Sequence, residues 1–356
     1  MALFLTHHTP WPAPQTAYEA EALAFCRSWL AGQNTFTLHT SGSTGTPKPI
    51  TLTRAQMQAS ARLTGQTLGL VPGDTALVCL NIRYVAGIMM LVRGLELDLP
   101  MTIIEPEANP FTHLTADTNS FAFTALVPLQ LQTILSAGNE SQAGHLNAMK
   151  AILVGGAATS PALEQAVQGI TAPVYATYGM TETVSHIALR RLNGSTRSEW
   201  FTALNGVNLG VDERGCLHIT SAATNGEQIQ TNDVVDLPDP MHFRLLGRAD
   251  RVINSGGVKI QPEQVEQLIQ RVLAQNQASG LPRLFVAGLP DEKLGQRVVV
   301  VCEQVSLSDA QWTALQAIIR KEAGPYAVPR EWLTVPQFAE TPTGKVDQRA
   351  ILAGIR

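Results

Sequence analysis

The chain has 356 residues, of which 45% are hydrophobic and 15% are charged, and its formal net charge at pH 7 is −4. This composition is ample for a packed core in about two domains and excludes a chain that is disordered over most of its length. No basic run could follow a phosphate backbone, so we expect no nucleic-acid partner.

The cysteines and the amino-terminal segment predict the compartment. Cys26, Cys79, Cys216 and Cys302 lie far apart and none falls in a C-x-x-C pair, so neither a zinc site nor a disulfide framework is expected. The first residues lack a charged region followed by an apolar run, and no window approaches the ~18 apolar residues of a membrane span. We therefore expect a soluble cytoplasmic protein without a membrane span.

From residue 37 to residue 178, short β-branched runs alternate with helical segments. The strand-like runs read FTLHT, TALVCL, MTIIEP, AILVGG and PVYATYG. This alternation is typical of an α/β fold, with a mostly parallel sheet covered by helices. Thr53 with Gln56, and Ser308 with Gln311, have the spacing of capping boxes that begin helices. The ligand site is then expected at the carboxyl ends of the strands.

The pattern changes after residue 198 to short strands and turns, and a new helical pattern begins after Arg251. Glycine and polar residues cluster at 247–251, which indicates a domain boundary there. We therefore predict a large domain over residues 1–247 and a small α+β domain over residues 248–356.

The strongest chemical signal is the segment TSGSTGTPK, which directly follows the strand-like run FTLHT. Its glycines allow a tight turn that exposes N–H groups, its hydroxyls add donors and its lysine adds positive charge, which together suit a polyphosphate. The Walker spacing is not met, and on composition alone a plain surface loop explains the segment equally well. The residues expected to contact phosphate are Thr40, Ser41, Gly42, Ser43, Thr44, Gly45 and Lys48.

Later motifs, taken in order, resemble those of the adenylate-forming superfamily of acyl-CoA synthetases, adenylation domains and luciferases. Thr40–Lys48 resembles the family's phosphate loop, which grips the β- and γ-phosphates of ATP. The stretch Gly155, Gly156 and Ala157 resembles the segment that lies against adenine. The resemblance covers nearly the whole chain and implies the family's large ATP- and acyl-binding domain with a small mobile lid at the carboxyl end.

The segment YGMTE is similar to the family's aromatic-Gly-x-Thr-Glu motif. The resemblance implies that Tyr178 stacks on adenine, that Gly179 and Met180 also contact ATP, that Thr181 binds phosphate in catalysis, and that Glu182 is a catalytic residue that holds Mg²⁺. The residue types agree with these roles, because a carboxylate is a hard ligand for Mg²⁺ and a phenol ring offers a π-face.

Two further motifs resemble the family's ribose and hinge segments. Thr231–Asp233 resembles T-G-D with an asparagine in place of the glycine, which implies that Asp233 binds the ribose hydroxyls. The sequence GRAD is similar to G-R-x-D, which implies that Arg248 also reaches the ribose and that Asp250 is the hinge between the domains.

The segment SGGVK resembles the lid loop that lines the tunnel for the pantetheine arm of coenzyme A. Gly256, Gly257 and Lys259 are the implied tunnel residues, since small residues allow the arm close to the backbone. A plain tight turn at the two glycines is the alternative.

The segment Thr341–Lys345 resembles the loop of the family's catalytic lysine. Joining a carboxylate to an α-phosphoryl group brings two anions together, so a cation placed there stabilises the transition state. The implied position of Lys345 on the lid requires the lid to close for one half-reaction and to rotate for the next. The implied cofactor and co-substrates are Mg²⁺, ATP and coenzyme A.

Two departures from the family pattern affect the prediction. Only 39 residues precede Thr40, far fewer than the family usually has, so we expect most of its first subdomain to be missing. A sheet edge exposed in this way would be covered in a homodimer. Tyr84 stands where the family's acyl-pocket histidine is found, beside Arg83, which argues against fatty-acyl substrates.

An arginine at the acyl pocket suits an acid with a second carboxylate, because a guanidinium binds that group through two hydrogen bonds. The candidates are Arg83, Arg93 and Arg190, with Ser185 and His186 as polar neighbours, and a structural role explains each arginine equally well. The stretches 83–93 and 178–190 resemble the short o-succinylbenzoate-CoA ligases of menaquinone biosynthesis.

The predicted function is therefore an ATP-dependent acid–thiol ligase that forms acyl-AMP and then acyl-CoA, with o-succinylbenzoate as the leading substrate. The alternatives are another aryl- or acyl-CoA ligase, an adenylation enzyme that loads a carrier protein, and an acyl-adenylate binder without catalysis. Retention of Lys345, Glu182 and Asp250 argues against the last.

Overall fold

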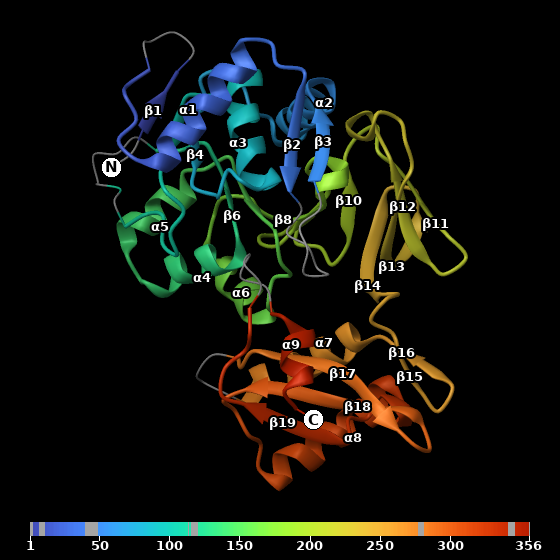
Figure 1. The fold of residues 1–356 in the computed structure, drawn as a ribbon. Helices are drawn as coiled ribbons and strands as arrows, with labels where there is room; N and C mark the ends of the chain where they lie inside the picture. The colour runs from blue at the N-terminus through green and yellow to red at the C-terminus, as the bar shows by residue number, and fades with distance from the viewer. Residues whose placement is uncertain are drawn as a thin grey trace. The chain divides into compact units, whose positions relative to one another are not determined.

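The computed structural model describes residues 3–6, 11–39, 49–112, 114, 120–276, 281–340 and 346–355. The chain divides into two compact units (Figure 1). Unit 1 comprises Met1–Gly210, Ile219–Ile229 and Pro238–Phe243, and unit 2 comprises Val211–His218, Gln230–Leu237 and Arg244–Arg356. Each unit contains separate stretches of chain, so the division into domains 1–247 and 248–356 stays a prediction.

Five neighbouring parallel strands form the centre of unit 1. In spatial order they are β5 (Met101–Ile103), β4 (Ala76–Val78), β6 (Phe123–Leu126), β7 (Ala151–Val154) and β8 (Val174–Gly179). The strands β4, β6 and β7 are buried along their whole length, as expected for parallel strands covered on both faces.

Six α-helices among the described residues of unit 1 accompany these strands. Figure 1 shows one group of α1 (Ala17–Leu30), α2 (Arg54–Leu68) and α3 (Val85–Glu96), and another of α4 (Pro128–Ser136), α5 (Glu140–Asn147) and α6 (Pro161–Ala166). The capping box predicted at Thr53 is present, with Gln56 N donating to the threonine side chain and Thr53 N donating to the glutamine side chain. The box predicted at Ser308 is present at the start of α8 in unit 2.

Antiparallel strands extend the sheet on both sides. On one side β1 (Leu3–Leu5) pairs with β5, and on the other β9 (His186–Arg191), β10 (Phe201–Ala203) and β14 (His242–Arg248) follow β8. The predicted α/β fold is confirmed, and its sheet is mixed. Pairing changes to antiparallel at β9 because a short turn, with no crossover helix, joins β8 to β9.

The remaining elements complete the strand order and its connections. After β14 come β13 (Ile229–Asp239), β12 (Cys216–Thr220) and β11 (Asn208–Val211), while β2 (Thr35–His39) and β3 (Pro49–Thr53) form a separate two-stranded sheet. Short 3₁₀ turns occur at η1 (Val167–Gly169), η2 (Thr181–Thr183), η3 (Ala222–Thr224) and η4 (Pro325–Ala327).

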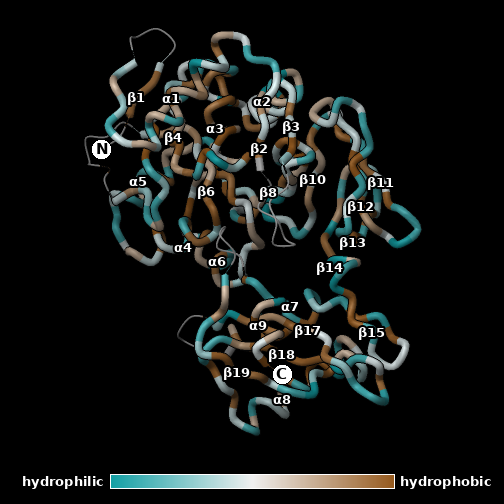
Figure 2. The backbone as a smooth tube through the Cα atoms, in the orientation of Figure 1, coloured by the Kyte–Doolittle hydropathy of each residue, from teal (hydrophilic) through white to brown (hydrophobic). Residues whose placement is uncertain are grey.

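Unit 2 contains a small sheet with a core on each face. Its strands are β15 (Ile253–Ser255), β16 (Val258–Ile260), β17 (Leu284–Asp291), β18 (Gly295–Glu303) and β19 (Glu331–Val335), with helices α7 (Pro262–Asn276), α8 (Asp309–Ala323) and α9 (Gln348–Ala353). Val298 and Val300 pack into the cluster that contains α7 and α8 residues, whereas Val299 and Val301 pack with Phe338 and Ile351. Figure 2 shows this hydrophobic character along β17 and β18, and the predicted α+β composition is confirmed.

Candidate functional site

Two of the predicted nucleotide segments follow neighbouring strands of unit 1. Residues 155–157 come directly after β7, and Tyr178 and Gly179 end β8, with η2 immediately behind them. Because β7 and β8 are parallel, both segments leave the sheet at the same edge. The two segments thus lie at the carboxyl ends of parallel strands, while their contacts with ATP stay predictions.

Two glycines at this edge allow a close approach of the backbone. A Cβ atom on Gly155 would lie 2.1 Å from Thr177 Oγ1, and one on Gly179 would lie 2.2 Å from the backbone oxygen of Ser185. Both distances are far inside van der Waals contact. A larger residue at position 155 would push the chain away from Thr177, and a larger residue at position 179 would push it away from Ser185.

The ring of Tyr178 is fixed by two phenylalanines. Its centroid lies 5.9 Å from that of Phe201 and 5.0 Å from that of Phe243, both edge-on, and the two phenylalanine rings stack at 5.3 Å. Ala188 of β9 lies opposite Tyr178 in the strand register and leaves room for this cluster. Edge-on packing of this kind holds a ring in one orientation.

Thr183, which the motif analysis did not single out, closes the turn after Tyr178. Its hydroxyl accepts a hydrogen bond from Met180 N at 3.0 Å and lies 2.9 Å from the Ser185 carbonyl oxygen. Thr183 is buried, whereas Glu182 is exposed. The turn therefore keeps the Glu182 carboxylate accessible. A hydroxyl three residues after the start of a turn is the local signal for such a cap.

The residues of this edge fit a Mg²⁺ ion that arrives with a nucleotide. In the part of the chain that the structure describes, no group of three or more His, Cys, Asp or Glu side chains could hold a metal. Mg²⁺ bound with nucleotides takes one or two carboxylates and completes its shell with phosphate oxygens and water. The single carboxylate of Glu182 is therefore sufficient to hold the ion together with phosphate oxygens and water.

The turn is followed by a strained residue. Val184 has a φ of 67° and is buried, an outlier for a β-branched side chain. Such strain costs about 1–3 kcal/mol and persists only where the surroundings enforce it. It directs the chain from the Glu182 turn into Ser185 and His186.

Ser185 and His186 belong to a buried polar network around Arg93 of α3. Arg93 is 2% exposed, and it donates to Ser185 Oγ at 2.5 Å and to Thr64 Oγ1 at 3.3 Å. The His186 ring completes the network, with Nδ1 3.3 Å from Ser185 Oγ and Nε2 3.4 Å from Thr64 Oγ1. The network joins α2, α3 and β9.

The guanidinium of Arg93 is a buried cation. No carboxylate forms an ion pair with Arg93 among the described residues, and burial lowers the pKa of its guanidinium to about 10. Burial, and then the charge of Arg93, lowers the pKa of His186 well below 6.5, so the imidazole is neutral at pH 7. An uncompensated buried charge costs several kcal/mol, which an incoming carboxylate would offset.

The neutral imidazole predicts a pH dependence of stability. Between its lowered pKa in the fold and about 6.5 in the unfolded chain, the unfolded state binds more protons, so stability falls as the pH drops below about 6.5. We expect His186→Gln to lose less of its thermal midpoint between pH 7.5 and pH 5.5 than the parent protein loses. Calorimetry at the two pH values measures this, and identical losses in both proteins would contradict it.

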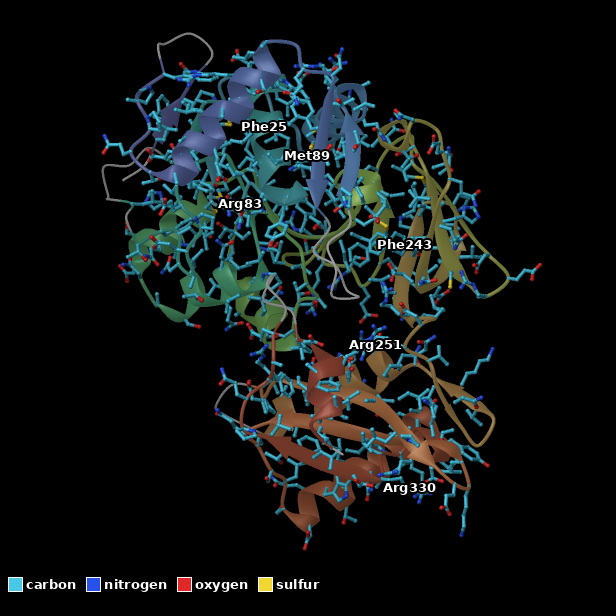
Figure 3. The ribbon with its side chains drawn as sticks, in the orientation of Figure 1. Phe25, Arg83, Met89, Phe243, Arg251 and Arg330 are labelled. Carbon is cyan, nitrogen blue, oxygen red and sulfur yellow. The ribbon has the colours of Figure 1, made fainter. Side chains whose placement is uncertain are left out.

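The other two candidate arginines have acidic partners. Arg83, labelled in Figure 3, is 72% exposed and pairs with Glu21 of α1 at 2.5 Å. Arg190 pairs with Glu164 of α6 at 2.5 Å. Tyr84 is half-buried at the start of α3. The structure thus groups Ser185 and His186 with Arg93 and does not bring Arg83 or Arg190 to them.

Unit 2 brings the predicted ribose and hinge residues together. Arg248 holds Asp250 through two hydrogen bonds of 2.9 and 2.8 Å and donates to Asp233 at 3.0 Å. The hydrogen bond and the charge of Arg248 lower the pKa of Asp250. The ribose and hinge roles themselves stay predictions.

The two glycines of the predicted tunnel form the turn of a hairpin between β15 and β16. Gly256 and Gly257 have φ of 60° and 82°, the left-handed pair that two-residue hairpin loops require. Their backbone is therefore a tight turn, which is compatible with either interpretation. Lys259 is exposed on β16, and the tunnel role of all three residues stays a prediction.

Two predicted segments lie outside the described residues. They are the phosphate loop, with Thr40, Ser41, Gly42, Ser43, Thr44, Gly45 and Lys48, and residues 341–345, with Lys345. Within the described ranges, no helix combines the length and the apolar character needed to cross a membrane.

A family model and solved structures of acyl-CoA synthetases are similar to this chain. A model of the family described as AMP-binding enzyme matches residues 7–204. A solved acyl-CoA synthetase (AMP-forming)/AMP-acid ligase II-like protein from Dyadobacter fermentans is 46% identical, with a TM-score of 0.67 and coverage of 100% of both chains. An o-succinylbenzoate CoA synthetase of Bacillus subtilis in complex with its acyl-adenylate intermediate has the same fold, with a TM-score of 0.71 at 20% identity over 88% of this chain and 68% of that chain.

Two curated relatives extend the comparison. The 2-succinylbenzoate–CoA ligase of Listeria monocytogenes is 26% identical over 360 residues, which cover 95% of this chain and 73% of the relative. The enzyme of the same description from Bacillus cereus is 29% identical over 287 residues, which cover 73% of this chain and 58% of the relative. This chain thus spans little more than half of the Bacillus cereus protein.

Proposed function

Because the chain belongs to the AMP-binding enzyme family, we propose that it is an AMP-forming acid–thiol ligase that joins a carboxylic acid first to AMP and then to coenzyme A. The observation that carries the proposal is the meeting of residues 155–157 and the Tyr178–Glu182 turn at one edge of the parallel strands, within the part of the chain that matches the family. Family membership agrees with the resemblance drawn from the motifs.

In this proposal different residues of the chain serve different parts of the first half-reaction, the formation of acyl-AMP. Tyr178 stacks on adenine from its fixed orientation, while Asp233 and Arg248 bind the ribose. Glu182 holds Mg²⁺, which supplies charge neutralisation at the phosphates. Lys345 provides a cation where the carboxylate attacks the α-phosphoryl group. Preorganised groups of this kind stabilise the charge that develops in the transition state.

We propose o-succinylbenzoate as the acid, which places the chain in menaquinone biosynthesis. The buried Arg93 supports a substrate with a second carboxylate, because a guanidinium without an acidic partner gains most from one. The relatives described as 2-succinylbenzoate–CoA ligases support the same acid. We further propose a cytoplasmic location, in keeping with four free cysteines. The predicted homodimer stays a prediction.

A product assay tests the proposal. Incubation with ATP, Mg²⁺, o-succinylbenzoate and coenzyme A is expected to yield AMP, pyrophosphate and a CoA ester, because adenylation precedes thiol transfer. Chromatography identifies the nucleotides and the ester, and benzoate is the control for the second carboxylate. ADP and phosphate as products would contradict the reaction class. A panel of acids that gave its best rate with a monoacid would contradict the substrate, and pyrophosphate release without transfer to free coenzyme A would favour a carrier-protein acceptor.

A further inference from the structure

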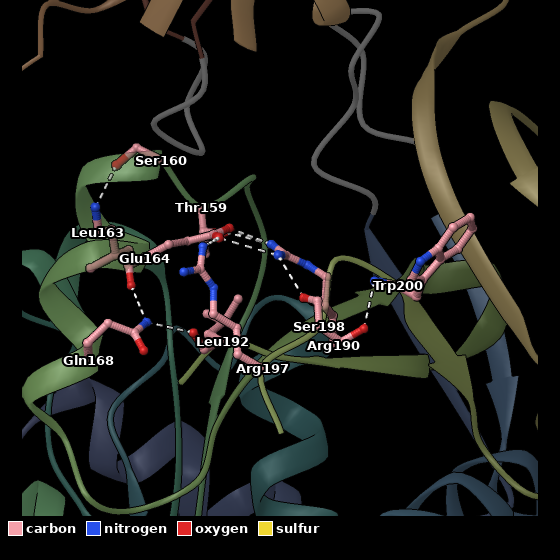
Figure 4. A network of polar contacts seen from close by, with 10 residues as sticks. All are labelled: Thr159, Ser160, Leu163, Glu164, Gln168, Arg190, Leu192, Arg197, Ser198 and Trp200. Carbon is pink, nitrogen blue, oxygen red and sulfur yellow. Dashed lines mark hydrogen bonds and ion pairs between the residues drawn. The ribbon is translucent and has the colours of Figure 1, made fainter. Parts of the chain in front are cut away.

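Glu164 of α6 is the centre of a charged network on unit 1 (Figure 4). Its carboxylate accepts two hydrogen bonds from Arg190 of β9, at 2.5 and 3.4 Å. It also accepts one from Thr159 Oγ1 at 2.8 Å, and that hydroxyl in turn accepts one from Arg190 at 3.2 Å. The three side chains therefore form a closed triangle.

The triangle is largely shielded from solvent. The side chains of Glu164 and Arg190 are each 14% exposed. Burial raises the pKa of the Glu164 carboxyl, but the hydrogen bonds and charge of Arg190 outweigh it and leave the pKa below its ordinary value. The Glu164 carboxyl is thus ionised at pH 7. A shielded ion pair with two hydrogen bonds fixes geometry more firmly than a surface pair.

The triangle contacts both parts of the proposed adenine site. Thr159 ends the stretch that begins with Gly155, two residues beyond Ala157. On the other side, the Arg190 guanidinium lies 5.6 Å from the centre of the Phe201 ring, and Phe201 packs edge-on against Tyr178. One ion pair therefore holds the segment after β7 and, through one ring, the aromatic residue of β8.

We propose that Glu164 and Arg190 are positioning residues for nucleotide binding, which hold the Gly155–Thr159 segment and the Tyr178 ring at the separation that adenine requires. This inference rests on the proposed function. It moves Arg190, which the sequence suggested for the acyl pocket, to the nucleotide side of the site. Neither residue touches the reacting atoms, so the pair acts on the affinity for ATP and leaves the chemical step unchanged.

The sharpest variant is Thr159→Val, which opens the triangle without leaving an unpaired charge. Loss of a hydrogen bond to charged groups corresponds to about tenfold in affinity, so we expect the KM for ATP to rise about tenfold, with kcat and the KM for the acid within about twofold of the parent. The double variant Glu164→Gln/Arg190→Gln is expected to raise the KM for ATP at least as much as Thr159→Val does. Arg190→Lys, which keeps the charge, is expected to fall between the parent and the double variant.

The matched control is Arg197→Gln, because Arg197 lies 3.5 Å from the same carboxylate but is 49% exposed. We expect it to leave the KM for ATP unchanged. Titration calorimetry with ATP and Mg²⁺ measures binding without turnover. A parent protein that failed to bind ATP would overturn the inference and the proposed function together. A parent that bound ATP, with variants that were less heat-stable yet had an unaltered KM for ATP, would overturn the inference alone.

Discussion

Arg93→Gln is expected to raise the KM for o-succinylbenzoate by about 100- to 1000-fold, since removing one partner of a buried charge pair costs 2–5 kcal/mol or more. The KM for ATP is expected to change little, because Arg93 lies in the network with Thr64, Ser185 and His186 and not with the nucleotide segments. We also expect the thermal midpoint not to fall, because the variant removes a buried cation that forms no ion pair with a carboxylate of the described residues. Steady-state kinetics and calorimetry measure the two effects.

The control for this prediction is Arg83→Ala. Arg83 is exposed and pairs with Glu21 on the surface, and exposed ion pairs contribute little, so the variant is expected to keep the parent's KM for the diacid. Benzoate-like monoacids provide a second control, because they lack the group that Arg93 would bind. Equal loss of activity toward monoacids and diacids in Arg93→Gln would contradict the role of Arg93.

The choice among the three arginines shows what the sequence could not predict. Arg83, Arg93 and Arg190 look alike along the chain, and each stands near a predicted pocket segment. They differ in their partners, and those partners are distant in sequence, with Glu21 62 residues from Arg83 and Glu164 26 residues from Arg190. Only the fold reveals that Arg93 is buried and that no carboxylate in the described part of the chain pairs with it.

Features that depend only on residues close together in the sequence could be predicted from it. The capping boxes at Thr53 and Ser308 need only four consecutive residues, and the parallel centre follows from alternating strand and helix patterns. The change to antiparallel pairing after β8 had no such signal. The turn there is made by Val184 at positive φ, a residue type that the sequence would assign to a strand.

The motifs on β13 and at the end of β14 show the same limit. Arg248 and Asp250 are near neighbours, so their pairing could be expected from the sequence, but the hydrogen bond from Arg248 to Asp233 spans 15 residues. It joins two motifs that were recognised separately. Their juxtaposition is what makes a shared role at the ribose a physical proposal.

The described residues that flank the segment 341–345 are fixed in the small sheet. Glu340 and Val346 form an antiparallel bridge on either side of the segment. Phe338 and Ile351 are buried in the core on one face of β18, and Val346 packs against that core. The described residues on both flanks of the segment are therefore held at the same face of the small sheet.

Lys345→Ala is expected to slow pyrophosphate release by about 1000-fold, because removing one preorganised group from a charged transition state typically costs this much. Thioester formation from chemically supplied acyl-AMP is expected to stay within about threefold of the parent, since that step no longer brings a carboxylate to a phosphoryl group. Rapid-quench measurement of each half-reaction separates the two effects. Lys321→Ala, which removes an exposed lysine of α8, is the control and is expected to change neither rate. Equal slowing of both half-reactions in Lys345→Ala would show that the lysine serves the fold or both steps, and would exclude a lid that presents it for adenylation alone.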